Sequence, residues 1–199
     1  MHLVLIGPPG SGKGTQASRV ALAWGVPHIS TGDILRRAVA SGSMLGDAVK
    51  DAMSRGELVS DEIMTDLVAE RLADLDATSG FVLDGFPRTV DQALALDALM
   101  EERGPLAVVE LSVPDDELVR RIGHRRVLEG RMDDNDAVVR ERLAVYYRST
   151  QPVIDFYKAR RTLFTIDGNL PAEDVTERIN LAVNPLVDLF VTQSKDASS

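Results

Sequence analysis

A glycine-rich segment near the start of the chain has the composition of a phosphate-binding loop. It follows an apolar run, precedes a segment of helical period and reads Gly7-Pro8-Pro9-Gly10-Ser11-Gly12-Lys13-Gly14-Thr15. Its glycines let consecutive backbone N–H groups turn toward phosphate oxygens, and a following helix N-terminus adds partial positive charge. The Lys13 ammonium can reach the outer phosphates of a nucleotide. Because strand, loop, lysine and helix occur in the required order, we predict a nucleotide site rather than an ordinary turn. Its ATP-binding candidates are Gly10, Ser11, Gly12, Lys13, Gly14 and Thr15.

The metal-binding position of this loop departs from the general pattern. Gly14 follows the lysine where a serine or threonine usually gives a hydroxyl to magnesium, and Thr15 comes one place later. Asp84 ends a buried apolar run and can hold nucleotide-bound Mg²⁺ through water. The alternative for Asp84 is a helix cap. We therefore expect magnesium to be held by the nucleotide and Asp84 rather than by a loop hydroxyl.

A second nucleotide site is indicated after the same apolar run. The segment reads Asp84-Gly85-Phe86-Pro87-Arg88-Thr89, and Gln92 follows. A guanidinium suits phosphate, and the Gln92 amide has a donor and an acceptor that fit the paired edge of adenine. Arg88 alone could be a solvated surface charge, but a buried strand that ends in this combination has few structural reasons for all of these residues.

The elements that position these segments alternate between short apolar runs and longer stretches of helical period, which predicts an α/β fold with a parallel sheet. The five expected strands are Leu3–Ile6, Pro27–Ile29, Phe81–Leu83, Ala107–Leu111 and Leu163–Ile166. Helical patterns cover Gln16–Trp24 and Asp136–Lys158, and a small helical lobe is inserted at residues 30–59. In such sheets ligands bind beyond the carboxyl ends of the strands, which is where both candidate sites lie.

Composition restricts the class of protein. The 199 residues are 44% hydrophobic and carry a formal net charge of −9, so we predict one domain over residues 1–191, no nucleic-acid partner and no membrane partner. No apolar stretch approaches the roughly 20 residues of a membrane helix, and we expect a cytoplasmic protein. The absence of cysteine excludes disulfides and cysteine-ligated zinc. Residues 192–199 are polar, and we expect a disordered tail.

The motifs resemble those of the adenylate kinase family of nucleoside monophosphate kinases over nearly the whole chain. The matching segments are the loop Gly7–Thr15, Ser30–Arg36, Asp84–Arg88, Arg121-x-x-x-Arg125, Gly130–Asp134 and Arg142–Tyr146. The resemblance implies a three-layer P-loop fold that transfers the terminal phosphoryl group of ATP, with Mg²⁺, to AMP and makes two ADP. The catalytic residues that it implies are Lys13, Arg88, Arg125, Arg131 and Arg142.

The resemblance also implies where each nucleotide binds. Arg121, Arg125 and the backbone near Leu170 would contact ATP. The AMP-binding set would be Thr31, Arg36, Glu57, Leu58, Val59, Gly85, Phe86, Pro87, Arg88, Gln92, Arg131 and Arg142. Seven arginines lie between Arg120 and Arg142 in a chain of net charge −9, and fixed guanidinium groups would neutralise the moving phosphoryl group. We interpret the remaining three, Arg120, Arg126 and Arg140, as a solvated face paired with acidic residues.

The segment that would form the lid, residues 125–134, is short, because only five residues separate Arg125 from Arg131. The chain therefore resembles the short-lid form of the family. That form implies no zinc, a monomer, and closure of both this segment and the inserted lobe over substrates. Two alternatives stay open. One is another monophosphate kinase, which acts on UMP or CMP or takes GTP as donor; Thr89, where UMP/CMP kinases typically have asparagine, favours AMP. The other is a nucleotide-driven switch ATPase, which needs no second nucleotide pocket.

Overall fold

A five-stranded parallel sheet forms the centre of the protein in a computed structural model that describes residues 1–129 and 136–196. The strands are β1 (His2–Ile6), β2 (His28–Ser30), β3 (Phe81–Asp84), β4 (Leu106–Ser112) and β5 (Leu163–Asp167). Their order is β2-β3-β1-β4-β5, and every neighbouring pair is parallel. The predicted fold class and all five predicted strands are confirmed, with ends that differ by at most one residue.

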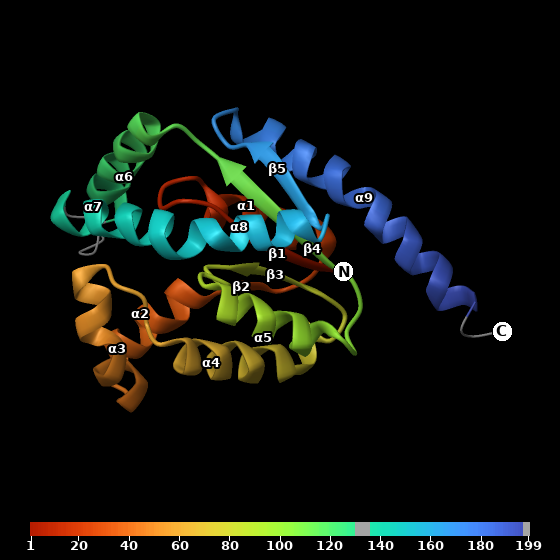
Figure 1. Cartoon of the computed structure of the whole chain (residues 1–199), viewed down its shortest axis with the longest axis horizontal. Coiled ribbons are helices and arrows are strands. Elements are labelled where there is room, and N and C mark those ends of the chain that lie inside the picture. The colour runs from red at the N-terminus through yellow and green to blue at the C-terminus, as the bar shows by residue number, and fades with distance from the viewer. Residues whose placement is uncertain (130–135, 197–199) are drawn as a thin grey trace.

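Helices cover both faces of this sheet (Figure 1). Alternate residues of β1 point to opposite faces: Leu3 and Leu5 pack with α1 (Lys13–Trp24) and α9 (Ala172–Asp196). On the other face, Val4 and Ile6 pack with three more helices. These are α4 (Asp61–Ala73), α5 (Val90–Met100) and α8 (Gln151–Ala159). A strand buried on both faces is apolar throughout, which explains why the strands appear in the sequence as continuous apolar runs.

The strand order places the crevice of the sheet beside β1. From β1 the chain crosses to β2 and β3 on one side and later reaches β4 and β5 on the other. The connections therefore diverge at the carboxyl end of β1, and such a switch point leaves an open crevice at the edge of the sheet. The glycine-rich loop begins there at Gly7, one residue after β1 ends.

A lobe of two helices lies between β2 and α4. Helix α2 (Thr31–Ser41) is capped by the Ser30 side chain, and α3 (Met44–Arg55) by the Ser43 side chain, which accepts from the Gly46 N–H at 3.1 Å. The helices approach closely, because a Cβ on Gly46 would stand 2.1 Å from a backbone oxygen of α2. Both helices lie within residues 30–59, the range of the expected lobe. Our sequence reading did not include α4, although Ser60 before Asp61 and Glu62 is a typical helix start.

The single helix predicted from Asp136 to Lys158 is wrong in its middle. The structure has α7 (Asp136–Val145), a π-helix (Tyr146–Thr150) and then α8. Pro152 lies in the first turn of α8. A proline lacks the N–H that an α-helix needs at that point, and its ring crowds the carbonyl four residues earlier. The wider π turn therefore precedes the proline, and it turns Thr150 so that its hydroxyl donates to the Arg88 carbonyl at 3.0 Å.

Helix α9 extends farther than our reading of the C-terminal segment. It continues past Pro185 to Asp196, so that residues 192–196, predicted as part of a disordered tail, are helical in the structure. Val175 and Ile179 anchor its first half in the core, and Trp24 Nε1 donates to Asn180 Oδ1 at 3.0 Å. Once a helix is nucleated, each further residue adds a hydrogen bond at low cost, which accounts for the extension.

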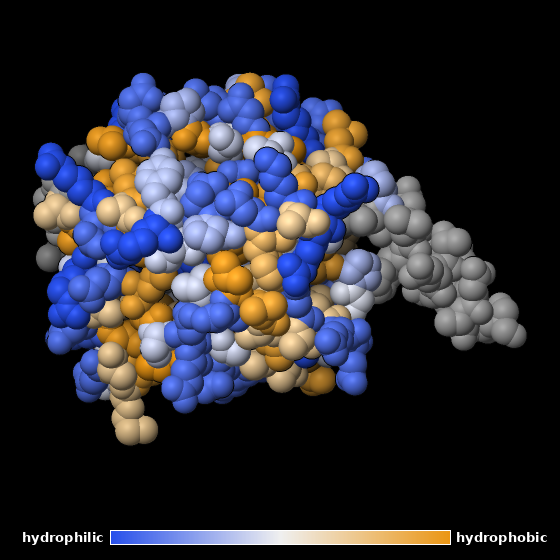
Figure 2. All heavy atoms as spheres, in the orientation of Figure 1, coloured by the Kyte–Doolittle hydropathy of each residue, from blue (hydrophilic) through white to orange (hydrophobic). Residues whose placement is uncertain are grey.

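Apolar and hydrophilic side chains are interspersed on the face seen in Figure 2. The large apolar side chains with the greatest exposure are Leu22, Met44 and Leu75, which belong to different elements. Singly exposed apolar residues are normal on protein surfaces. Within residues 1–129 and 136–196, no helix combines the length and the apolar character that crossing a membrane requires.

The burial of His2 predicts that the stability of the protein depends on pH. Its side chain is 3% exposed on β1, and burial lowers the pKa of His2 from 6.5 to about 4. Between these values the unfolded chain binds a proton that the folded chain does not. The free energy of unfolding should therefore decrease by about 3 kcal/mol as the pH falls from 6.5 to 4.

Urea unfolding of the wild type and of His2→Leu at pH 7 and pH 5 measures this contribution. The variant should lose less stability than the wild type between the two pH values. A matched variant at an exposed histidine, His124→Gln, should behave like the wild type. Equal pH dependence of the wild type and His2→Leu would contradict the assignment to His2.

Candidate active site

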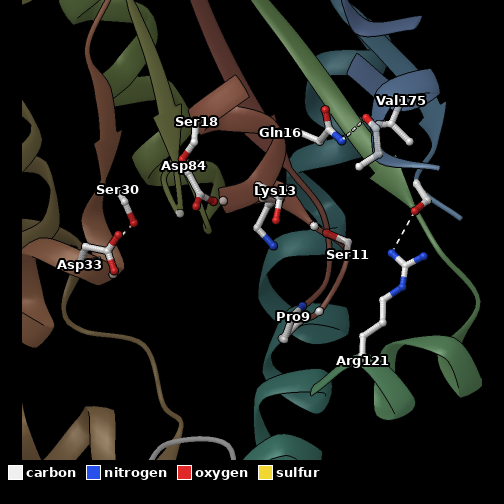
Figure 3. A pocket seen from close by; sticks show the side chains of 18 of the residues that line it. Pro9, Ser11, Lys13, Gln16, Ser18, Ser30, Asp33, Asp84, Arg121 and Val175 are labelled. Atoms are coloured by element: carbon white, nitrogen blue, oxygen red, sulfur yellow. Dashed lines mark hydrogen bonds between the residues drawn. The ribbon is translucent and has the colours of Figure 1, made fainter. Parts of the chain in front are cut away.

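A cleft of about 770 Å³ opens at the carboxyl edge of the sheet. The glycine-rich loop, the end of β3, the start of α2, helix α6 (Asp115–Glu129) and the loop after β5 line it. Lys13 lies in its middle, between Asp84 on one side and Arg121 on the other (Figure 3). All six candidate loop residues line this cleft, and they are Gly10, Ser11, Gly12, Lys13, Gly14 and Thr15.

The loop leaves the N-terminus of α1 open to an anion. Gly12 precedes the helix in a left-handed conformation (φ 94°), which is accessible to glycine. No side chain caps α1 and no acidic residue stands in its first turn, whereas serine or threonine side chains cap α2, α3, α4 and α5. The first N–H groups of a helix have no intrahelical partner, so the start of α1 offers donors and partial positive charge to phosphate.

Lys13 and Ser11 add polar groups to the same loop. The Lys13 ammonium donates to the carbonyl oxygens of Gly7 and Pro8 at 2.8 and 2.9 Å. Ser11 is buried, and its hydroxyl has no hydrogen-bond partner among the described residues. A buried hydroxyl without a partner is costly, so a ligand oxygen at this loop would satisfy a donor that the protein alone does not.

Asp84 ends β3 beside the phosphate loop. Its Oδ2 lies 4.0 Å from Nε2 of His28, whose Nδ1 lies 3.1 Å from the Ser18 hydroxyl. Among the described residues, no group of three or more histidines and acids could hold a metal ion. A single carboxylate at a phosphate site fits a magnesium ion that receives its other ligands from nucleotide oxygens and water. The position of Asp84 therefore agrees with nucleotide-bound magnesium.

A second, smaller pocket of about 70 Å³ lies between the helical lobe and the start of α5. Eight of the candidate AMP-binding residues line it, and they are Thr31, Arg36, Glu57, Leu58, Val59, Arg88, Gln92 and Arg142. Thr31 is buried, and its hydroxyl donates to the Asp84 carbonyl at 3.3 Å. The Glu57 carboxylate pairs with Arg55 at 2.9 Å.

Gly85, Phe86 and Pro87 connect this pocket with the end of β3. Gly85 has φ 90°, and a Cβ there would stand 2.5 Å from the Thr31 hydroxyl oxygen, so only glycine fits without a shift. Phe86 and Pro87 are buried and, with Gly85, line a small hollow next to Leu58 and Arg142. These three residues lie in the hollow beside the phosphate loop and do not line the second pocket, so their assignment to AMP stays a prediction.

Three arginines converge where the large cleft meets the second pocket. Arg36, Arg88 and Arg142 line both spaces, although they belong to α2, the segment after β3 and α7. Burial, together with the positive charges of Arg142 and Arg36, lowers the pKa of Arg88 to about 10, against the opposing effect of Asp84. The guanidinium remains charged at neutral pH, but its charged form is less stable than that of an arginine in water. Cations that repel one another in a partly desolvated site form a strong binding site for a polyanion.

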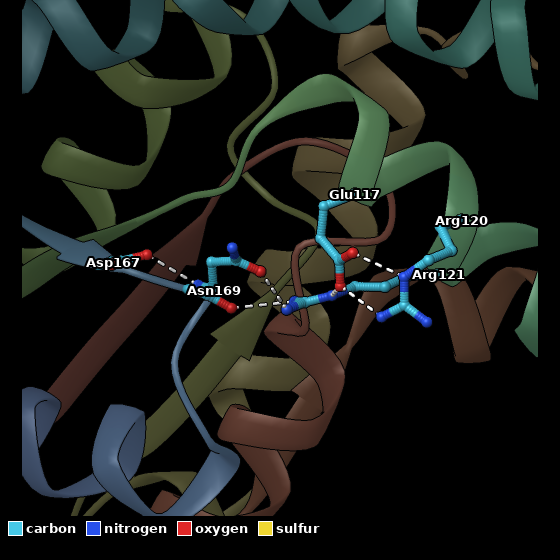
Figure 4. A network of polar contacts seen from close by, with 6 residues as sticks. Glu117, Arg120, Arg121, Asp167 and Asn169 are labelled. Carbon is cyan, nitrogen blue, oxygen red and sulfur yellow. Dashed lines mark hydrogen bonds and ion pairs between the residues drawn. The ribbon is translucent and has the colours of Figure 1, made fainter.

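Arg121 lies at the opposite end of the large cleft, in a network with Glu117 and the loop after β5 (Figure 4). It donates to Glu117 at 2.6 Å, to the Gly168 carbonyl at 2.9 Å and to Asn169 Oδ1 at 3.1 Å. Hydrogen bonds from Arg120 and Arg121 lower the pKa of Glu117 to about 2. Leu170 lines the cleft near this network. Arg120 is exposed and pairs with an acid, as expected from the sequence.

Some predicted site residues are not placed by the structure. Residues 130–135, which include Arg131 and the second half of the predicted lid, lie outside the described residues. Arg125 belongs to α6, but its side chain lies outside the description. The structure also connects Asp61 to the second pocket, since its carboxylate accepts from both Thr89 and Gln92. Asp61 was missed in the sequence analysis, because its only sequence signal is its position at the start of a helix, where an acidic residue is common.

Comparisons with known proteins agree with this geometry. The family model described as adenylate kinase matches residues 5–162. A protein of Xanthomonas campestris pv. campestris (strain 8004), named adenylate kinase, is 54% identical over 185 residues, which cover 92% of this chain and 99% of the relative. The adenylate kinase of Xylella fastidiosa (strain M12) is 50% identical over 185 residues with the same coverage.

Proposed function

The chain belongs to the adenylate kinase family, and from this premise we propose how its cleft transfers the terminal phosphoryl group of ATP to AMP, giving two molecules of ADP. The observation that carries the proposal is the convergence of Arg36, Arg88 and Arg142 between a phosphate-loop cleft and a second pocket. An enzyme that transfers a phosphoryl group between two nucleotides needs fixed cations where their phosphates meet. A switch ATPase has no such need.

ATP binds in the large cleft in this proposal. Its outer phosphates accept from the first N–H groups of α1, which no side chain caps, and from the Lys13 ammonium, which the loop carbonyls already hold in place. The adenosine end lies toward Arg121 and Leu170, where Glu117 and the Gly168 carbonyl restrain the Arg121 guanidinium. Arg125, one turn farther along α6, belongs to the same group of ATP ligands. Restrained donors bind phosphate at a lower cost in side-chain entropy.

AMP binds in the second pocket. Thr31 and Gln92 contact its base, the segment 57–59 lines the pocket, and the segment 85–87 lies in the hollow beside the phosphate loop. Arg36 and Arg88 bind its phosphate through their planar donors. Gly85 brings Arg88 close to the phosphate loop, since the Arg88 Nε donates to the Gly85 carbonyl at 2.7 Å. The AMP phosphate is thereby directed toward the outer phosphate of ATP.

The transfer itself is an in-line displacement. A phosphate oxygen of AMP bonds to the terminal phosphorus of ATP, while the bond from that phosphorus to its bridging oxygen breaks and the electron pair leaves with ADP. Lys13, Arg88 and Arg142 neutralise the charge on the moving group, and we assign Arg125 and Arg131 to the same role. Two nucleotides held in line supply most of the remaining acceleration through proximity, so no covalent enzyme intermediate is needed.

Magnesium enters with the nucleotide. The activity of the family implies a nucleotide-bound Mg²⁺, which neutralises phosphate charge when bound. We propose that the Asp84 carboxylate orients this ion through its water shell. Gly14 has no hydroxyl to offer, and its Cα faces Asp84, since a Cβ there would stand 3.5 Å from Asp84 Oδ2. The chain has no cysteine to form a thiolate zinc site.

Water must be excluded during the transfer, because it is a competing nucleophile. The α2–α3 lobe and the α6–α7 region lie on opposite sides of the site (Figure 1). Gly56, at the end of the lobe, approaches Arg142 and Val138 of α7, because a Cβ there would meet both at about 3.0 to 3.1 Å. We propose that the lobe and the segment of residues 125–134 close on bound substrates. The monomeric, cytoplasmic state expected from the sequence is part of the same proposal.

Coupled product formation with ATP and Mg²⁺ tests the function. AMP, UMP, CMP and GMP should be compared with a reaction without acceptor. Rapid formation of two ADP for each ATP consumed, with AMP alone, is the expected result. Equal ATP consumption without an acceptor would support the switch ATPase instead, and faster transfer to UMP or CMP would support the other monophosphate kinases. Replacing ATP with GTP in the same assay tests the choice of donor.

A further inference from the structure

The Gln92 amide is held at both of its ends by the protein. The side chain is 1% exposed at the start of α5. Its Nε2 donates to Asp61 Oδ1 at 2.7 Å, and its Oε1 accepts from the Arg88 backbone N–H at 2.7 Å. An amide has two N–H donors and two acceptor lone pairs. One donor and one acceptor therefore remain for a ligand in the second pocket that Gln92 lines.

Asp61 holds the Gln92 amide from the side away from the pocket. It is the first residue of α4, its Oδ2 accepts from the Thr89 hydroxyl at 2.8 Å, and Thr89 caps α5 by accepting from the Gln92 N–H at 3.2 Å. Asp61 itself does not line the second pocket or the large cleft. The carboxylate therefore acts on the pocket only through the residues that it holds.

The Asp61 carboxylate and the Arg88 N–H together permit only one orientation of the Gln92 amide. A carboxylate accepts hydrogen bonds and cannot donate them, while the Arg88 N–H donates and cannot accept. Turning the amide over would place an oxygen against the carboxylate and an NH₂ group against an N–H. Both hydrogen bonds would be lost in a buried site and replaced by repulsion, which is costly.

We propose that Asp61 is a positioning residue that selects adenine over 6-oxopurines by fixing the orientation of the Gln92 amide. This inference rests on the proposed binding of AMP in the second pocket. The paired edge of adenine has an acceptor at N1 and a donor at N6, whereas hypoxanthine has a donor at N1 and an acceptor at O6. A fixed amide matches only one of these patterns, and an amide free to turn over matches both.

Asp61→Asn is the informative substitution. Asparagine has nearly the same shape, but its side chain both donates and accepts, so it can pair with Gln92 in either orientation. Only the Arg88 N–H then still opposes the turned-over amide. The substrates to compare are AMP and IMP, because IMP has the reversed pattern without the extra amino group of GMP. We expect the ratio of kcat/KM for AMP to that for IMP to fall by about tenfold or more. The kcat with AMP should stay within about threefold of the wild type.

Glu62→Gln is the matched control. Glu62 is exposed in the same first turn of α4, so its substitution removes one negative charge from the same helix end without altering the contacts of Gln92. The AMP to IMP ratio should keep its wild-type value in this variant. Thermal unfolding of both variants checks that α4 remains folded.

A double-mutant cycle keeps the proposal testable if Asp61→Asn proves unstable. Gln92→Leu should lower the AMP to IMP ratio by itself, and adding Asp61→Asn or Asp61→Ala should change that ratio no further. A ratio that stays at its wild-type value in Asp61→Asn, while both substrates lose rate equally, would reduce Asp61 to a structural residue and overturn the inference. Additive effects in the cycle would do the same. If the wild type does not use AMP at all, the proposed function fails instead.

Discussion

Replacing Arg88 with alanine should lower kcat/KM for AMP by about 10³-fold, mostly through kcat. Arg88 lines both the large cleft and the second pocket, so in the proposed binding of ATP and AMP its guanidinium lies where the moving phosphoryl group must pass. Its charge is destabilised without substrate, since burial and the neighbouring Arg142 and Arg36 lower its pKa to about 10. A bound polyanion would offset this repulsion between the arginines. Steady-state kinetics with AMP as the varied substrate measures the loss.

The same electrostatic argument predicts little effect of Arg88→Ala on stability. The variant loses a hydrogen bond to the Gly85 carbonyl but is relieved of a repelled cation. Its unfolding temperature should therefore change by less than about 3 °C without nucleotide. Arg37→Ala is the matched control, because Arg37 is an exposed arginine on the neighbouring helix α2 and should keep the wild-type rate. A loss of rate that follows a large loss of stability would contradict the charge-neutralising role.

Replacing Lys13 with methionine should lower kcat by about 10²- to 10³-fold. Methionine preserves most of the length of the side chain but removes the ammonium that lies in the middle of the cleft (Figure 3). In the structure this ammonium donates to the Gly7 and Pro8 carbonyls, so the loop holds it close to the open start of α1. Transfer would then proceed without this ammonium on the outer phosphates. Single-turnover measurements with saturating ATP and AMP separate the chemical step from binding.

Lys50→Met is the control for Lys13→Met. Lys50 is exposed on α3 and lines none of the described pockets, so its removal should leave the rate unchanged while altering the net charge by the same amount. The proposed role of Lys13 requires the loss to appear in the transfer step. A Lys13→Met variant that kept the wild-type single-turnover rate, and only needed more ATP, would show that the ammonium binds the ground state and the transition state equally.

The phosphate loop could be predicted because everything that defines it is contiguous. Strand β1, the glycines, Lys13 and the start of α1 follow one another directly in the sequence, and local backbone geometry is enough to form the N–H cradle. The five strands could be predicted for a similar reason, since burial on both faces requires an unbroken apolar run. The long helix at residues 136–158 failed at Pro152, where helical periodicity alone did not distinguish a π turn from an α turn.

The arginine cluster needed a resemblance to a known family before its members could be assigned. Composition alone gave no reason to separate Arg121 and Arg142 from Arg120 and Arg140. In the structure, Arg121 contacts Gly168 while Arg120 is exposed, although the two are adjacent in the chain. The side that each residue faces depends on how α6 packs against the loop after β5. That packing involves residues 47 positions apart, and no local pattern encodes it.

The sequence by itself determined the α/β class and the order of strand, glycine-rich loop, lysine and helix near its start. Only the tertiary structure decided that Arg36, Arg88 and Arg142 meet at one boundary, and that Asp61 reaches Gln92 across 31 positions of the chain. The physical reason is the range of the interactions. Helix starts, turns and strand burial depend on neighbours within a few residues, whereas repulsion between converging cations and the orientation of a buried amide depend on elements that folding brings together.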